Sequence, residues 1–191
     1  MEFVHLNVRS SYSQEYSILK IKDIFSKARE FGHKAVALTD LGTLMGVTEF
    51  LNTAESYPEI KPIIGLSMPV ELFESNHRLK TCFTFLAKDI DGYRCLVKLS
   101  SFKEFDCGHV ESCRYGNLMK VLQEYKGHII CICNLSYYKV LLKGIQETDS
   151  DLLRSNINGR DYILTKLKNL FGDDLYLEVV SRQGHKDSMH R

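Results

Sequence analysis

The opening segment, residues 3–13, joins a short strand pattern to side chains that can bind metals. Polar and apolar residues alternate, so an extended strand would place His5, Asn7 and Arg9 on one face. Histidine is the most common metal ligand of these three types. On the inward face of a first barrel strand, such residues would sit where a metal centre is built. The segment therefore predicts a metal-site position with His5 as its one strong ligand.

Two acidic residues lie at the ends of other apolar segments. Asp40 follows the strand-like residues 35–39 and precedes Gly42, and Glu178 lies in the strand-like residues 175–180. The carboxyl ends of parallel strands are where α/β active sites collect. A polar site formed by His5, Asp40 and Glu178 is one interpretation. Asp40 as the cap of the following helix or turn is the other.

The remaining polar motifs favour structural roles. Ser67 has no adjacent base, which makes it a poor nucleophile candidate. Cys107, His109 and Cys113 are closely spaced but lack the fourth ligand of a structural zinc site, so we expect a loop there. Cys131 and Cys133 lie on one face of a strand and are predicted to be small core residues. The basic run at residues 182–191 is predicted to be a solvated tail.

Composition restricts the class of protein. The 191 residues are 44% hydrophobic and 26% charged, and the formal net charge is +1. This balance gives no long-range attraction to nucleic acid or to an anionic membrane. The first residues lack a secretory signal pattern, and no apolar stretch approaches the roughly 18 residues that span a membrane. With six cysteines and no disulfide-scaffold spacing, we expect a cytoplasmic protein with reduced thiols.

The hydrophobic pattern alternates between strands and helices. Strands are predicted at residues 3–8, 35–39, 61–70, 82–87, 128–133 and 175–180, and apolar stripes of helical period at 21–28, 45–54, 93–100, 118–125, 140–145 and 162–170. Residues 103–117 have the weakest pattern and are predicted to be an excursion loop. Repeated strand–helix units indicate an α/β fold with a parallel sheet. The pattern does not separate an open sheet from a barrel.

Five blocks, in order, give the chain a resemblance to a known family. They are the opening residues 3–13, the Leu-Thr-Asp of residues 38–40, the Lys-Pro-Ile-Ile-Gly of 61–65, the Leu-Ala-Lys-Asp-x-x-Gly-Tyr of 86–93, and the Phe-Gly-Asp-Asp-Leu-Tyr-Leu-Glu of 171–178. The chain thereby resembles the N-terminal PHP (polymerase and histidinol phosphatase) domain of bacterial DNA polymerase III α subunits. In the fourth block, the family carries Asn where this chain has Asp89.

The resemblance implies a distorted seven-stranded β/α barrel, similar to a TIM barrel, around a cluster of usually three metals. At the family's ligand positions, however, only His5 keeps a strong ligand. The other positions carry weaker donors or none and would be vestigial: Asn7, Tyr16, Leu41, Ser67, Cys82 and Asn134. Because two or three divalent ions need compensating carboxylates, we expect no bound metal and no catalytic residue. One zinc ion held by His5 and Cys82, with both side chains pointing inward, is the alternative.

The resemblance also implies a biological context. Residues 1–191 would be a single PHP domain, an N-terminal fragment of a longer polymerase, and the barrel would lack its last strand here. The expected role is structural, in DNA replication. Its expected partners are the polymerase domain of the same parent chain, a proofreading exonuclease subunit, and DNA through the parent polymerase. The alternative is an active phosphoesterase or 3′–5′ exonuclease that uses zinc or manganese.

Overall fold

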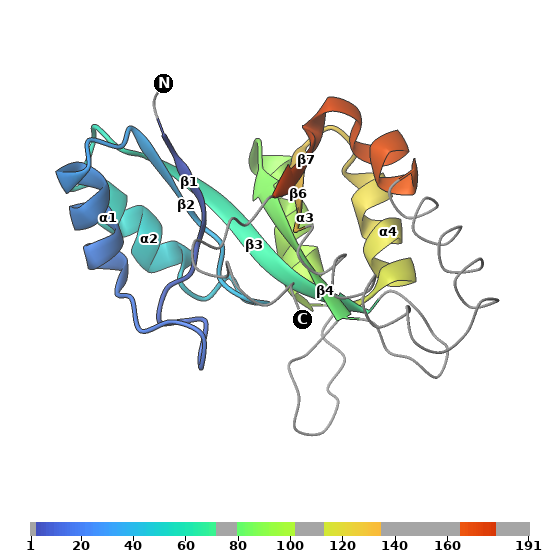
Figure 1. Cartoon of the computed structure of the whole chain (residues 1–191), viewed down its shortest axis with the longest axis horizontal. Coiled ribbons are helices and arrows are strands. Elements are labelled where there is room, and N and C mark those ends of the chain that lie inside the picture. Colours follow the sequence, from blue (N-terminus) through green and yellow to red (C-terminus); the bar gives the residue numbers. More distant parts are fainter. Residues whose placement is uncertain (1–2, 72–79, 102–112, 135–164, 179–191) are drawn as a thin grey trace, which may run out of the picture.

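The computed structural model describes residues 3–71, 80–101, 113–134 and 165–178, and its centre is one curled, mixed β-sheet (Figure 1). Its strands are β1 (His5–Val8), β2 (Ala35–Leu38), β3 (Lys61–Glu71), β4 (Lys80–Ala87), β5 (Cys113–Arg114), β6 (Ile129–Asn134) and β7 (Leu175–Glu178). The order is β1-β2-β3-β4-β6-β7, and the short β5 pairs with β3. Within the described ranges, β1 and β7 are the two ends of this order.

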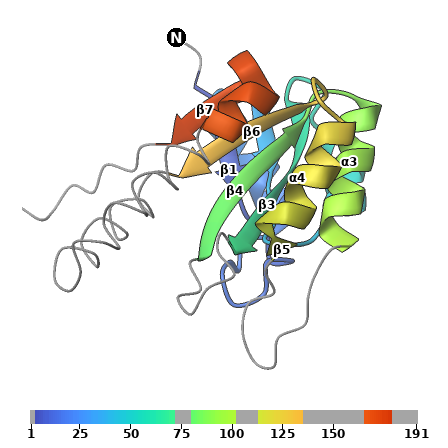
Figure 2. The same ribbon diagram turned by 90° about the vertical axis from the view of Figure 1, so that its right-hand side faces the viewer.

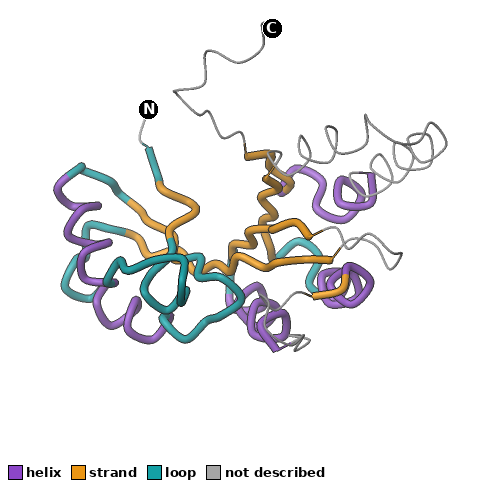
Figure 3. The backbone as a smooth tube through the Cα atoms, turned by 60° about the horizontal axis from the view of Figure 1, so that its bottom comes forward, coloured by secondary structure: helices purple, strands orange, loops and turns teal. Residues whose placement is uncertain are grey.

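The helices lie on the outer side of the curl (Figure 3). They are α1 (Ile21–Glu30), α2 (Val47–Ala54), α3 (Ile90–Ser101) and α4 (Tyr115–Glu124), and residues 165–171 are also helical. Figure 2 shows α3 and α4 side by side against the sheet. No helix among the described residues is both long enough and apolar enough to cross a membrane.

Two apolar clusters connect the helices to the sheet. Phe25 and Phe50, from α1 and α2, are fully buried against Val36 and Leu38 of β2. The larger cluster joins α3, α4 and residues 165–171 to β3, β4 and β6, and includes the fully buried Cys131 and Cys133. The prediction that these two cysteines are core residues is confirmed.

The expectation of an all-parallel sheet is wrong at β4. This strand runs antiparallel to both β3 and β6, with Glu71 opposite Lys80. A parallel crossover needs about a dozen residues or more. Residues 72–79 are too few for one, and so the chain returns alongside β3.

The predicted loop at residues 103–117 is partly wrong. Cys113 and Arg114 form β5 beside the far end of β3, α4 begins at Tyr115, and the Cys113 side chain is buried in the larger core cluster. A two-residue strand has no period of its own, and it forms only because β3 offers an edge. The predicted helix at 140–145, Cys107, His109 and the basic run at 182–191 lie outside the described residues.

Candidate functional site

A groove of about 1290 Å³ lies beside the sheet. Residues of β1, β3, β4, β6, β7 and α2 line it, and most are apolar, such as Ile63 and Ile132. Three predicted site residues, His5, Asn7 and Glu178, also line this groove. Asp40 does not, so the polar site predicted from His5, Asp40 and Glu178 is only partly assembled.

Asn7 and Glu178 connect the first and last strands. The Asn7 amide donates to Glu178 Oε1 at 3.3 Å. Its carbonyl oxygen lies 3.3 Å from Thr39 Oγ1, whose single hydrogen is shared with Val8 O at 3.1 Å. Both ends of the Asn7 amide are therefore used by protein groups. The sequence pattern did not single out Thr39 for this role, because the contact depends on how β1 pairs with β2.

His5 contacts a different neighbour. His5 pairs with Val36, and Val8 pairs with Leu38. Between these two pairs the chain advances three residues along β1 but only two along β2. β1 therefore contains one extra residue, which interrupts the alternation of its side chains. The His5 ring lies 5.0 Å from the His33 ring, centroid to centroid. Burial, and then the nearby His33, lower the pKa of His5.

Asp40 anchors a loop. Its carboxylate is 1% exposed and accepts from Ser10 N at 2.7 Å, Ser10 Oγ at 2.8 Å and Ser13 Oγ at 2.6 Å. Ser13 Oγ in turn accepts from the Leu41 backbone N–H. The carboxylate ties residues 10–13 to the end of β2, whereas the sequence predicted a cap for the residues that follow it.

The other vestigial positions also have protein partners. Tyr16 lies under the Arg9 guanidinium, 5.8 Å from Cζ to the ring centroid. Ser67 Oγ shares a hydrogen bond of 3.1 Å with Thr84 Oγ1, and both residues are buried. Leu41, which offers no donor atom, bridges to Ser67 through the backbone. The backbone of Asn134 pairs with Glu178.

The Cys82 thiol is a poor ligand and a poor nucleophile. Burial raises the pKa of this thiol to about 11. The positive charge of Arg9 acts to lower the pKa and the negative charge of Glu178 acts to raise it, and burial is the largest of the three effects. Metals and electrophiles react with the thiolate. The family ligand positions thus carry a largely protonated thiol at Cys82 and neutral or non-binding side chains elsewhere, apart from His5. These side chains do not fit a cluster of divalent ions.

The raised pKa predicts slow alkylation of Cys82. An ordinary thiol has a pKa of 9.0. A pKa about two units higher leaves about 100-fold less thiolate at pH 8, and the alkylation rate of Cys82 should rise about tenfold per pH unit. Iodoacetamide labelling followed by peptide mass spectrometry measures this rate. The urea-unfolded chain is the control and should react quickly. Equal rates in folded and unfolded chains would contradict the prediction.

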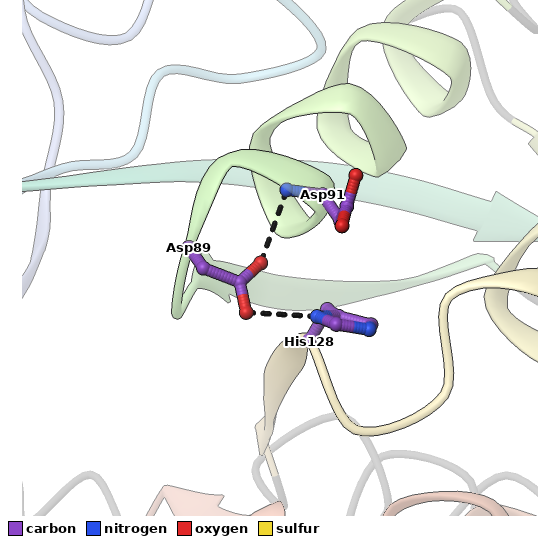
Figure 4. A group of neighbouring side chains, drawn as sticks. All are labelled: Asp89, Asp91 and His128. Atoms are coloured by element: carbon purple, nitrogen blue, oxygen red, sulfur yellow. Dashed lines mark hydrogen bonds and ion pairs between the residues drawn. The ribbon is translucent and has the colours of Figure 1, made fainter.

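One more group combines metal-ligand residue types: Asp89, Asp91 and His128, whose ligand atoms lie within 4.8 Å of one another (Figure 4). Their contacts are those of a helix cap. Asp89 Oδ1 accepts from the N–H groups of Asp91 and Gly92 at 3.0 Å, and Oδ2 bonds His128 Nδ1 at 2.8 Å. Asp91 bonds Arg94 at 2.7 Å. Asp89 thus satisfies the orphan donors at the start of α3.

A cap can be distinguished from a metal ligand by substitution. Asp89→Ala should lower the melting temperature by a few degrees, and Asp89→Asn should retain most of the stability, because Asn caps about as well as Asp. The backbone N–H of Gly92 and then His128 lower the pKa of Asp89 below 3.8. The advantage of Asp89 over Asn is therefore complete above about pH 5 and is lost as pH falls through the lowered pKa. Thermal unfolding from pH 2 to 7 tests this, and equal loss in both variants would contradict a cap.

Comparison with known proteins assigns the chain to a protein family. The model of the PHP domain family matches residues 5–182, and the chain belongs to that family. Its relatives include the DNA polymerase III subunit alpha of Borreliella burgdorferi, 30% identical over 198 residues, with 97% of this chain and 16% of the relative covered. That of Aquifex aeolicus is 28% identical over 192 residues, with 93% and 15% covered. That of Bacillus subtilis is 34% identical over 148 residues, with 75% and 12% covered. The chain thus spans less than a fifth of each of these relatives.

Proposed function

We propose that this chain is the PHP region of a bacterial replicative DNA polymerase, a DNA polymerase III α subunit, whose own phosphoesterase site has been lost. The sequence match to these subunits covers most of the chain and supports the context. The donor set carries the second part of the proposal. Asn7, Ser67 and Cys82 occupy family ligand positions with neutral side chains that already have protein partners or a raised pKa.

In this proposal the domain is structural. It braces the polymerase domain of the same parent chain and offers a docking surface for a proofreading exonuclease subunit, and it meets DNA only through the parent polymerase. The curled sheet is then part of a distorted seven-stranded barrel, and within the described residues it is open between β1 and β7. Asn7 and Glu178 hold β1 and β7 together across that opening.

Metal content and hydrolysis test the loss of the site. Elemental analysis of the purified chain should find fewer than two metal ions per molecule. We expect no hydrolysis of bis-p-nitrophenyl phosphate with added Mn²⁺, because neutral donors leave two or three dications uncompensated. Two or three bound ions, with turnover abolished by a chelator and by His5→Ala, would replace this proposal with an active phosphoesterase or 3′–5′ exonuclease.

A further inference from the structure

Four aromatic rings meet beside the first strand. The His5 ring lies 4.7 Å from Phe3 and 5.0 Å from His33, centroid to centroid, and these two rings are 5.8 Å from each other. His33 also contacts Phe31 at 5.9 Å. His33 is not at a ligand position of the PHP family. The cluster therefore lies apart from the vestigial metal site except for His5 itself.

The spacing of the two imidazoles suits a shared metal ion. Zinc binds histidine nitrogens at about 2.0–2.1 Å in tetrahedral geometry, which puts the centroids of two ligating rings roughly 5 Å apart. The rings of His5 and His33 are 5.0 Å apart and tilted by 50°. Imidazole pairs prefer borderline ions such as Zn²⁺, Cu²⁺ and Ni²⁺ over Mg²⁺ or Ca²⁺.

His33 also has an unused ligand atom. Its Nδ1 is buried and, among the described residues, has no hydrogen-bond partner. Buried polar atoms rarely lack a partner, and one that does calls for an explanation such as an ion. Metal ligation needs neutral imidazole.

The backbone holds both histidines in place. Gly32, at φ +70°, and His33 close the end of α1 through bonds from Gly32 N to Arg29 O at 3.0 Å and from His33 N to Ala28 O at 2.8 Å. His5 is fixed by its pairing with Val36 of the adjacent β2. A closed helix end and a paired strand keep the backbone of both residues fixed. Because His33 Nδ1 is covered, the side chains around it must move to admit an ion and its water.

We propose that His5 and His33 form a two-histidine site for a borderline divalent transition-metal ion, with water completing its coordination. The ion would fasten the edge strand β1 to the turn between α1 and β2. This proposal does not depend on the proposed function, because a single ion held by two neutral histidines provides no phosphoesterase centre.

Zinc titration of the chelator-treated 191-residue chain tests the site. Calorimetry should find one Zn²⁺ per chain, and His33→Phe, which keeps a ring in the cluster, should weaken binding at least about tenfold, since even outer-shell changes cost about 10–100-fold. Zn²⁺ should raise the melting temperature of the wild type but not of His33→Phe. The control His128→Gln removes the imidazole beside Asp89 and should bind Zn²⁺ as the wild type does.

Copper provides a second, spectroscopic readout. The Cu²⁺ EPR spectrum of the wild type should show hyperfine coupling to two imidazole nitrogens, and that of His33→Phe to one. Unchanged Zn²⁺ affinity in His33→Phe, loss of binding in His128→Gln, or no binding by the wild type would each overturn the two-histidine site. The proposed function would fail on a different result, namely chelator-sensitive hydrolysis.

Discussion

Gly92→Ala should destabilise the protein by about 3 kcal/mol, at the upper end of overpacking costs. Gly92 is the third residue of α3, and a Cβ there would overlap the backbone oxygen of His128 and lie 3.1 Å from Ala87 Cα. Both obstacles are backbone atoms. That oxygen also accepts a hydrogen bond from the N–H of Lys88 at 3.0 Å. Relief would require α3 to move away from the start of β6, which would also disturb the Asp89 cap.

The chain offers a matched control in a second helix. Gly116 lies near the start of α4, and an added Cβ there would meet nothing within 4 Å. Gly116→Ala should therefore stabilise the protein, by up to about 1 kcal/mol, because alanine loses less backbone entropy than glycine in a helix. Urea unfolding with a shared m-value measures both. Similar midpoints for the two variants would show that α3 and β6 are not in such close contact.

Local sequence pattern predicted the elements with a strong period of their own. The apolar stripe at residues 21–28 predicted α1, and four buried residues, including Ile24 and Phe25, form its inner face. The buried run of β2 was equally clear. In these segments the residues that set the local hydrophobic period are also the residues that pack in the core. Local sequence pattern and tertiary packing therefore favour the same structure.

The contacts of the site were less predictable because they depend on the register in which neighbouring strands pair. Alternation placed His5 beside Asn7, but the extra residue in β1 gives them different partners, His33 and Thr39. Asp40 was correctly singled out at a strand end. Its partners Ser10 and Ser13 lie about 30 positions earlier, and no local period reports them. Family resemblance marked residues 86–93 as a block without saying that Asp89 caps α3.

Asp40→Ala should lower the free energy of unfolding by about 3 kcal/mol or more. The change removes the acceptor of three short hydrogen bonds and leaves the donors of Ser10 and Ser13 buried, at 0% and 2% exposure. Hydrogen bonds to a charged group are worth about 1.5–3 kcal/mol each, although they do not add fully. Thermal and urea unfolding measure the total. Asp173→Ala, at a fully exposed carboxylate, is the control and should change stability by less than about 0.5 kcal/mol.

Asp40→Asn separates the shape of this side chain from its charge. With Oδ1 kept, Ser10 N and Ser13 Oγ retain their acceptor, and the Ser10 hydroxyl can turn to accept from the new amide. The loss should therefore be about 1 kcal/mol, well below that of alanine. Limited trypsin digestion adds a local readout. A hydrogen bond from Ser11 N to Leu19 O closes the loop of residues 11–19, and the trypsin sites Arg9 and Lys20 flank this loop. Asp40→Ala should be cut at these two sites before global unfolding, and Asp40→Asn should resist. Equal cutting of both variants would mean that Asp40 does not hold this loop.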